Sequence, residues 1–284
     1  MRAIEAFLDG LIDYAGLYPP AGLDMHSAVE KYQSGQRGKQ GRALGRFVVD
    51  LNRIEEFRSV AGASADEMRL SLIVSRAADG ARVAALLDAG LHIEAVEFKA
   101  GRVEEVATYR KHVPSGVTTY IEVPVDGDAF EFIDAIAGSG SRIKLRMGGL
   151  VAAAFPEANL VAKVLNEALR RRLSLKATAG LHHPIRSRHP FTYENGSSSG
   201  MMHGFVNLFC AAALVYFGGT ARDAERILNE EKANAWEVCD DAIAWGAMRW
   251  STAQIREVRQ DFMIGIGSCS FEEPMRDLEA LGWL

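Results

Sequence analysis

Strand-like and helical segments alternate along most of this 284-residue chain, and the alternation predicts an α/β protein with a parallel sheet. Eight strand-like segments can be counted, and the length is close to the roughly 250 residues typical of a (β/α)8 barrel. Several strands alternate apolar with charged side chains, whereas an ordinary central strand of a parallel sheet is apolar on both faces. We therefore predict one (β/α)8 barrel domain over residues 1–284, with an open doubly wound sheet as the alternative.

Six of the strands are short runs bounded by turn residues and rich in β-branched or alternating side chains. They cover residues 46–50, 70–75, 94–99, 118–123, 142–147 and 173–178. An irregular first strand at residues 13–16 and a last strand at residues 262–267 complete the eight.

The intervening segments have the apolar spacing of amphipathic helices. The expected helices cover residues 2–12, 24–34, 53–61, 80–89, 103–112, 129–137, 156–172, 203–217, 220–229 and 252–259. Two segments interrupt the rhythm: a long polar loop at residues 181–202, and a small β-hairpin at residues 236–245, inserted before the last of these helices.

Composition excludes several classes of partner. A net charge of -5 argues against a nucleic-acid binder, which usually shows a basic excess. The longest apolar run, residues 205–217, is too short to span a membrane, and no signal peptide is recognisable at the N-terminus. The three cysteines are odd in number and widely spaced, as expected for reduced thiols. We expect a cytoplasmic protein, with residues 205–217 and 236–245 as the surfaces for any homo-oligomer.

The two-residue period of a strand places the polar side chains of each strand on one face. The opposite faces are apolar and must meet the helices, so the polar faces are expected to line the barrel interior. The expected interior residues are Arg46, Asp50, Ser71, Ser75, Glu97, Lys99, Tyr120, Glu122, Lys144, Arg146, Lys176 and Thr178. Barrel interiors are normally filled by branched apolar side chains, and sites lie at the C-terminal ends of the strands, so this departure indicates a functional site.

Charges on these faces do not balance. The cations are Arg46, Lys99, Lys144, Arg146 and Lys176. The carboxylates are Asp50, Glu97 and Glu122. The excess of two cations predicts an anionic ligand, a carboxylate or a phosphate, held chiefly by Arg146 and Arg46. A lysine among other cations in a dry site also has its ammonium form disfavoured, which would make a nucleophilic amine accessible.

Lys176-Ala-Thr-Ala-Gly180 resembles the strand of class I aldolases of the deoxyribose-phosphate aldolase type, in which small residues and a glycine follow a lysine. That family has its Schiff-base lysine on one barrel strand and a second lysine on the next, and Lys144 and Lys176 are similarly placed. The chain departs from the pattern where Leu145 and Arg146, rather than hydroxyl residues, follow Lys144. A longer stretch, Lys176-Ala-Thr-Ala-Gly-Leu-His-His-Pro184 with Met202-His-Gly-Phe205, is similar to a bacterial barrel family of unassigned activity.

The resemblance implies aldol cleavage of a small anionic carbonyl or sugar-like substrate through an imine, without a cofactor. Lys176 is the expected nucleophile or base, with Lys144 as its rival, and Glu97 and Glu122 are the expected proton-transfer groups. His182 or His183 is expected to act as a general acid or base over the barrel mouth, because imidazole titrates near neutral pH.

Further groups are expected to contact the substrate. Backbone amides can approach an anion closely at glycines or at the start of a helix. The residues expected here are Asp50, Lys99, Gly148, Gly149, Thr178, His203, Ser268 and Ser270.

Two other functions remain open from the sequence. His182, His183 and His203 with an interior carboxylate could supply a metal-dependent hydrolase or isomerase, although their spacing matches no metal motif and our prediction is that no metal is bound. A barrel that binds an anionic metabolite without turnover is the other alternative.

Overall fold

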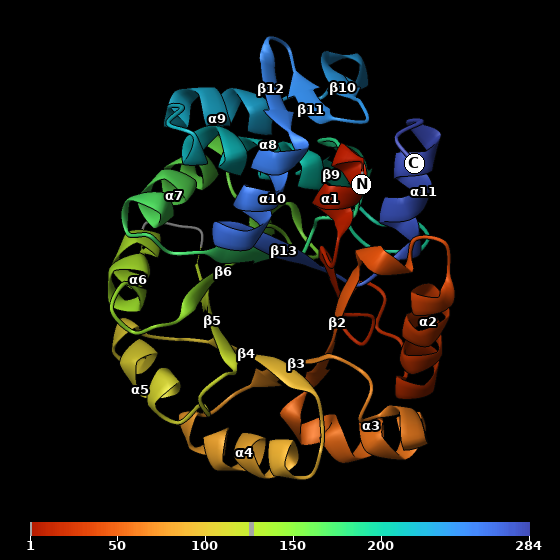
Figure 1. The fold of residues 1–284 in the computed structure, drawn as a ribbon, viewed down its shortest axis with the longest axis vertical. Coiled ribbons are helices and arrows are strands. Elements are labelled where there is room, and N and C mark those ends of the chain that lie inside the picture. The colour runs from red at the N-terminus through yellow and green to blue at the C-terminus, as the bar shows by residue number, and fades with distance from the viewer. Residues whose placement is uncertain (1, 125–127) are drawn as a thin grey trace.

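Eight parallel strands close into a barrel in the computed structural model, which describes residues 2–124 and 128–284 (Figure 1). The order around the barrel is β1, β13, β7, β6, β5, β4, β3 and β2, so the first strand pairs with the last. The strands are β1 (Ile12–Tyr14), β2 (Leu44–Asp50), β3 (Leu70–Val74), β4 (Ile93–Lys99), β5 (Thr118–Val123), β6 (Arg142–Arg146), β7 (Leu175–Thr178) and β13 (Met263–Ser268). The closed order confirms the (β/α)8 prediction and excludes the open sheet.

Helices surround the strands on the outside, as Figure 1 shows. The helices that follow β1 to β6 in turn are α2 (Met25–Arg37), α3 (Ile54–Ala61), α4 (Gly80–Asp88), α5 (Val106–Lys111), α6 (Ala129–Ile136) and α7 (Ala158–Arg170). The remaining helices are α1 (Ala3–Leu8) before β1, α8 (Phe205–Tyr216), α9 (Ala221–Leu228) and α10 (Thr252–Asp261) between β7 and β13, and α11 (Glu272–Ala280) after β13.

The apolar faces of the strands meet these helices. Phe47, Val49, Val96, Ile121 and Ile143 are fully buried in the hydrophobic core between strands and helices. Their alternate neighbours along the same strands point into the barrel, because successive strand side chains point to opposite faces. The division of each strand into an outer apolar and an inner polar face is therefore as the sequence predicts.

Three local differences from the prediction concern the irregular parts of the chain. The first strand is β1, which begins one residue earlier than expected and ends at Tyr14. The polar loop after β7 contains an antiparallel pair, β8 (Ser187–Pro190) and β9 (Ser199–Met202). The expected hairpin gains a third strand, because β10 (Trp236–Val238), β11 (Ala242–Trp245) and β12 (Met248–Ser251) form one antiparallel sheet.

Helix α8 is largely buried within the chain, and Phe217 just after it is exposed. Its residues Phe205 to Ala213 are all buried, because α7, α9 and α10 pack against it. This burial explains why the run 205–217 is apolar on every side. In the described ranges 2–124 and 128–284, no helix combines the length and the apolar character that crossing a membrane requires.

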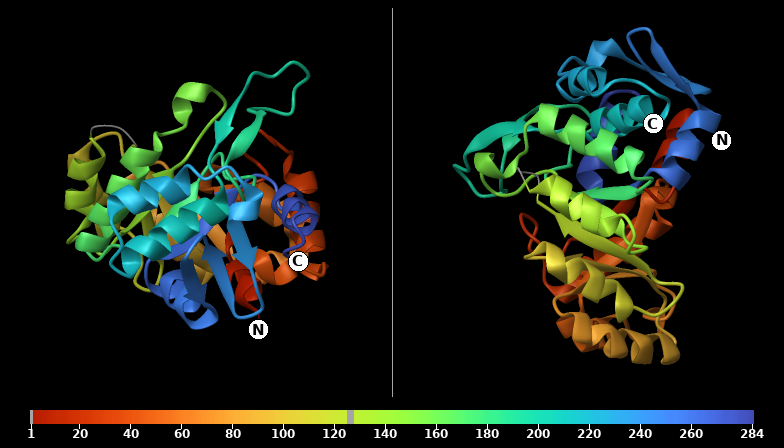
Figure 2. Two further views of the ribbon diagram at one scale, coloured as in Figure 1. Left: turned by 90° about the horizontal axis from the view of Figure 1, so that it is seen from above. Right: turned by 90° about the vertical axis from the view of Figure 1, so that its left-hand side faces the viewer.

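The two ends of the barrel differ in what covers them. The β8–β9 hairpin projects from the end at which the strands finish, whereas the N-terminus lies at the other end (Figure 2, left). Active sites of such barrels lie at the C-terminal ends of the strands. The residues on this end of the barrel are therefore the first to consider.

Candidate active site

Lys176 lies at the centre of the barrel interior. Its Nζ is 2.5 Å from Asp13 Oδ2 on β1 and 2.7 Å from Glu97 Oε1 on β4. Nζ also lies 5.3 Å from the centre of the Tyr120 ring, on β5. The side chain is only 2% exposed, so this ammonium is held by two carboxylates with almost no access to solvent.

Lys144, on the neighbouring strand β6, continues the chain of charges toward the strand ends. Its Nζ is 2.9 Å from Glu97 Oε2 and 2.9 Å from Glu122 Oε2. Glu97 thus binds both lysines, one through each carboxylate oxygen, and its Oε1 also accepts a hydrogen bond of 2.6 Å from Ser71 Oγ. At the outer end of the chain, Arg146 Nη1 lies 3.3 Å from Glu122 Oε1.

These contacts set the protonation states of the site. Burial by itself would raise the pKa of Glu97 and Glu122, but Lys144 and Lys176 together outweigh it at Glu97, and Lys144 and Arg146 together outweigh it at Glu122, so the pKa of each carboxyl lies below its usual value. Burial would lower the pKa of Lys176, but Asp13 and Glu97 outweigh it and raise that pKa. The pKa of Lys144 is raised in the same way by Glu97 and Glu122.

The lysines are therefore firmly protonated in the resting site, and the expectation of a lowered lysine pKa is wrong. Counting along the sequence omitted two carboxylates, Asp13 and Glu94, that the fold brings to the interior network. The cations of that network are Arg46, Arg69, Lys144, Arg146 and Lys176, and its carboxylates are Asp13, Glu94, Glu97 and Glu122. The excess of cations is therefore one rather than two, since five positive charges face four negative ones.

A cavity of about 340 Å³ opens above this network at the C-terminal ends of the strands. It is lined by ten of the residues that the sequence singled out. They are Glu97, Lys99, Glu122, Lys144, Arg146, Gly149, Lys176, Thr178, His182 and Ser268. Four of the ten are lysine or arginine and two are glutamate, so the wall of this cavity carries an excess of positive charge.

The turn after β7 owes its shape to close backbone packing. Ala179 and Gly180 both have positive φ values, 65° and 67°, and both line the cavity. A Cβ on Gly148 would lie 2.9 Å from the Gly180 Cα and 2.6 Å from Phe155 Cε1. A left-handed alanine is strained, and such strain is concentrated at functional sites. Gly148 therefore serves the packing of two turns, and of the predicted pair Gly148 and Gly149 it is Gly149 that lines the cavity.

His182 is part of a second constellation, which lies on the cavity wall. Its Nδ1 is 3.1 Å from Glu273 Oε2, and its Nε2 is 3.9 Å from the Sγ of Cys269. Tyr193 on the β8–β9 connection donates a hydrogen bond of 2.6 Å to the same Glu273 oxygen. Burial alone would lower the pKa of His182, but Cys269 and Glu273 raise it to about 9, so the imidazole is cationic at neutral pH.

The sequence did not reveal this cysteine and carboxylate as partners of His182. Cys269 lies in the stretch 265–270, which the sequence indicates as either an anion-binding turn or a set of packing and turn residues, and the sequence gives no reason to single out Glu273. Cys269 lies directly after β13, and Glu273 follows on the first turn of α11. Both can meet His182 only because β7 and β13 are neighbours in the closed barrel. The pairing of the seventh and last barrel strands, which follows from the count of eight strands, was the feature of the sequence that could have indicated these partners.

Several predicted residues lie elsewhere. His183 is 2.6 Å from Asp277 Oδ2 and stacks on His189, and His203 Nε2 is 2.7 Å from the Pro156 carbonyl oxygen. Asp50 caps the short helix Leu51–Arg53 by accepting a hydrogen bond from the Asn52 amide.

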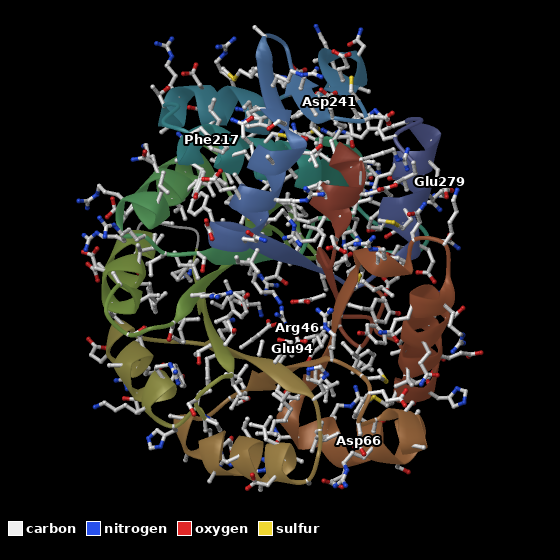
Figure 3. The ribbon with its side chains drawn as sticks, viewed as in Figure 1. Arg46, Asp66, Glu94, Phe217, Asp241 and Glu279 are labelled. Atoms are coloured by element: carbon white, nitrogen blue, oxygen red, sulfur yellow. The ribbon has the colours of Figure 1, made fainter. Side chains whose placement is uncertain are left out.

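Two more predicted contacts with the substrate also lie apart from the cavity. Ser270 accepts a hydrogen bond from the Glu273 amide and so caps α11. Arg46 lies at the opposite end of the barrel, where it binds Asp13 and Glu94; Figure 3 labels Arg46 and Glu94 within the ring of strands.

The divergence of the histidines also decides what could hold a metal ion. His182, His183 and His203 each point to a different partner, and in the part of the chain that the structure describes no group of three or more His, Cys, Asp or Glu side chains is arranged for a metal. The metal-dependent alternative therefore has no ligand set among these residues.

No family model and no curated protein matches the sequence. Among solved structures, the chain is similar to the nitroalkane oxidase of Streptomyces ansochromogenes, with 14% identity and a TM-score of 0.37, over 63% of this chain and 62% of that chain. The match thus spans less than two thirds of that enzyme. The chain is also similar to the spore cortex-lytic enzyme SleL of Bacillus cereus, with 12% identity and a TM-score of 0.38, over 99% of this chain and 68% of that chain. These likenesses are too distant to bear on activity.

Proposed function

We propose that this protein is an imine-forming lyase that cleaves or forms a carbon–carbon bond in a small anionic aldehyde or ketone. The observation that carries the proposal is the pair of lysines on adjacent strands, Lys144 and Lys176, joined by Glu97 at the C-terminal end of the barrel. Imine formation needs an amine at the cavity and a nearby group that accepts and returns its proton. Lys144 supplies the amine, and Glu122, whose Oε2 is 2.9 Å from the Lys144 Nζ, is the group that can accept and return the proton.

Lys144 is the better candidate for the nucleophile, although the sequence favoured Lys176. The side chain of Lys144 is 10% exposed and that of Lys176 is 2% exposed, so a carbonyl carbon entering from the mouth reaches Lys144 first. Lys176 is held between Asp13 and Glu97 below it. The role that suits Lys176 is to keep Glu97 ionised and in place.

A protonated lysine must lose its proton before it can attack, and Arg146 supplies a way for the substrate to trigger that loss. In the resting site, Arg146 and Lys144 both stabilise the Glu122 carboxylate. A substrate phosphate or carboxylate that binds Arg146 withdraws one of the two positive partners, and the pKa of Glu122 rises. Glu122 then accepts the proton of Lys144, and the free amine attacks the carbonyl carbon.

The later steps use the same groups. Glu122 returns its proton to the carbinolamine oxygen, which leaves as water, and the carbon–nitrogen double bond forms. Glu122 then takes the proton of the substrate β-hydroxyl; the carbon–carbon bond breaks, and its electron pair passes into the imine to give an enamine. The His182 imidazolium, which lines the same cavity, protonates the enamine carbon, and hydrolysis frees Lys144.

Borohydride trapping tests the proposal. The protein is incubated with a panel of phosphorylated and carboxylated aldehydes and ketones, reduced, and mapped by mass spectrometry. The expected result is a single reduced adduct on Lys144 that disappears in Lys144→Met and persists in Lys163→Met, a change at an exposed lysine on α7. A panel that leaves no adduct, or an adduct that persists in Lys144→Met, would overturn the mechanism.

A further inference from the structure

A second and larger cavity, of about 580 Å³, lies at the opposite end of the barrel, at the N-terminal ends of the strands. Among the residues that the structure describes, only Lys176 lines both cavities, so its ammonium forms part of the wall between them. Besides Lys176, the residues that line the second cavity include Arg42, Arg46, Arg69, Arg259 and Tyr120. This end of a barrel normally contributes to stability rather than to a site, so a large polar cavity here calls for an explanation.

Arginines dominate the wall, and three of them have carboxylate partners. Arg42 Nη2 lies 3.2 Å from Asp9 Oδ1, and Arg46 Nη1 lies 3.5 Å from Asp13 Oδ2. Glu94 lies between Arg46 and Arg69, at 2.9 Å from the Nε atom of each. The three carboxylates are thus shared among three of the four guanidinium groups.

Arg259 on α10 is the fourth, and no carboxylate within the described residues lies at ion-pair distance from it. Its guanidinium donates to backbone carbonyls instead: Nη2 is 2.9 Å from the Asp9 oxygen, and Nη1 binds the oxygens of Met263 and Ile264. Its buried Nε has no hydrogen-bond partner in the described structure. Burial lowers the pKa of Arg259 to about 10, which records a cation that lacks a compensating charge.

Tyr120 provides an independent observation. Its side chain is fully buried, it lines the cavity, and its hydroxyl has no hydrogen-bond partner among the residues that the structure describes. Buried hydroxyl groups almost always have a partner, so an unpaired one on a cavity wall marks a place where a polar ligand or water binds. A donor that lacks an acceptor, beside a cation that lacks an anion, favours a ligand with negatively charged oxygens.

We propose that the cavity at the N-terminal end of the barrel is a second binding site, separate from the lysine cavity, for the phosphate or carboxylate groups of a small metabolite. Guanidinium groups bind such oxyanions through paired N–H donors. Arg42 and Arg69 are 70% and 40% exposed and leave the cavity open to solvent, while Arg46 and Tyr120 form its buried part.

Thermal unfolding at constant ionic strength tests this site without requiring turnover, so the result stands whether or not the proposed lyase activity does. The measurements use the Arg146→Gln background, because Arg146 offers an anion a competing position in the other cavity. Inorganic phosphate and citrate are titrated separately, with sodium chloride keeping the ionic strength constant. The rise in the unfolding midpoint depends on the ratio of the anion concentration to its dissociation constant, so the titration gives an apparent affinity.

At least one of the two anions is expected to raise the unfolding midpoint; phosphate alone would indicate a phosphorylated ligand, and citrate alone a polycarboxylate. Arg42→Gln should weaken the apparent affinity by about tenfold or more, since it removes a charged donor. Tyr120→Phe, which removes only the hydroxyl, should weaken it by about two- to tenfold. Arg53→Gln, at an exposed pair with Glu56, is the matched control and should leave the affinity unchanged.

Two results would overturn the proposal. One is the absence of stabilisation by either anion beyond that of sodium chloride. The other is stabilisation that Arg42→Gln and Tyr120→Phe both leave unchanged, which would place the anion elsewhere on the protein.

Discussion

Replacing Glu97 by glutamine perturbs the centre of the charge network with the smallest change in shape. The Glu97 carboxylate accepts from Ser71, Lys144 and Lys176, all within 2.9 Å. Glutamine keeps one acceptor oxygen but turns the other into an amide nitrogen that also carries hydrogens. In Glu97→Gln, both buried ammonium groups therefore lose a charge partner, and one of them faces another donor.

The expected loss of stability follows from the burial of these groups. Removing one partner of a buried ion pair costs about 3–5 kcal/mol. Each lysine retains one carboxylate, Lys144 retaining Glu122 and Lys176 retaining Asp13, so the lower end of that range applies. For a chain of 284 residues, whose unfolding entropy is about 0.6 kcal/mol/K, a loss of about 3 kcal/mol corresponds to a fall of about 5 °C in the unfolding midpoint.

The pH dependence gives the same substitution a second readout. The folded-state pKa values of Lys144 and Lys176 are raised above the ordinary lysine value of 10.5. Their pairing therefore stabilises the fold fully below that pH, and the contribution is lost as pH rises through the folded-state values. The difference between wild type and Glu97→Gln should be complete near neutral pH and should narrow in strong alkali.

Thermal and urea unfolding followed by circular dichroism measure this difference. Glu56→Gln, at an exposed pair with Arg53, is the control and should change stability by less than about 0.5 kcal/mol. If Glu97→Gln unfolds within about 1 °C of the control, the charges are not a tightly paired buried network. The argument that Glu97 raises the pKa values of Lys144 and Lys176 would then also be wrong.

Three further predictions follow from other parts of the structure. The pKa values of Asp13, Glu97 and Glu122 are all lowered, so their contribution to stability is present above the ordinary values of 3.8 and 4.5 and is lost as pH falls through the folded-state values. Burial lowers the pKa of His203 from 6.5 to about 4, so the unfolded chain gains that proton first. The urea midpoint should therefore begin to fall below about pH 6.5 and should fall more steeply below about pH 4; a midpoint that stays constant from about pH 7 to about pH 3 would contradict this. Iodoacetamide should alkylate Cys269, which lines the lysine cavity, before Cys210, because Cys210 is buried in α8 and burial raises its pKa. His182→Gln should slow the alkylation of Cys269 and leave that of Cys210 unchanged. Mass mapping that finds the same Cys269 rate in the wild type and in His182→Gln would contradict the cysteine–histidine contact. Gly148→Ala should destabilise the fold by about 1–3 kcal/mol, because its Cβ would meet Phe155 and Gly180, while Gly138→Ala, which meets nothing within 4 Å, should not; equal urea midpoints would show that the two turns can move apart.

The placement of the interior charges could be predicted because it depends only on strand periodicity. Glu97, Glu122, Lys144 and Lys176 were assigned to the interior from the alternation of polar and apolar residues, and all four are buried there and paired. The closed barrel follows from the same alternation, because a polar face can be enclosed only if the sheet curls around it. Which of these residues act in catalysis stays a prediction.

The protonation of the lysines could not be predicted, because it depends on distances between strands that are remote in sequence. Asp13 lies 163 positions from Lys176 along the chain but 2.5 Å from it in space. Glu94 is near the start of β4, where its side chain pairs with arginines, and it was not assigned to an interior face. The pKa of Lys176 is raised chiefly by Asp13 and Glu97, and that of Lys144 by Glu97 and Glu122, so the direct contacts of each lysine rather than the total charge of the interior decide its protonation.

Stability alone does not account for a charged barrel interior. Each buried charge loses its hydration, and well-packed apolar side chains of similar volume often give an equally or more stable fold. The outer faces of the same strands show that this chain uses apolar packing wherever strands meet helices. Glu97 also links the two lysines, so a proton that leaves Lys144 changes the field at Lys176, and Lys176 in turn borders the arginine-lined cavity. If the two proposed sites bind anions, the ionic interior would couple them, because an anion bound at one end would alter the charge balance at the other.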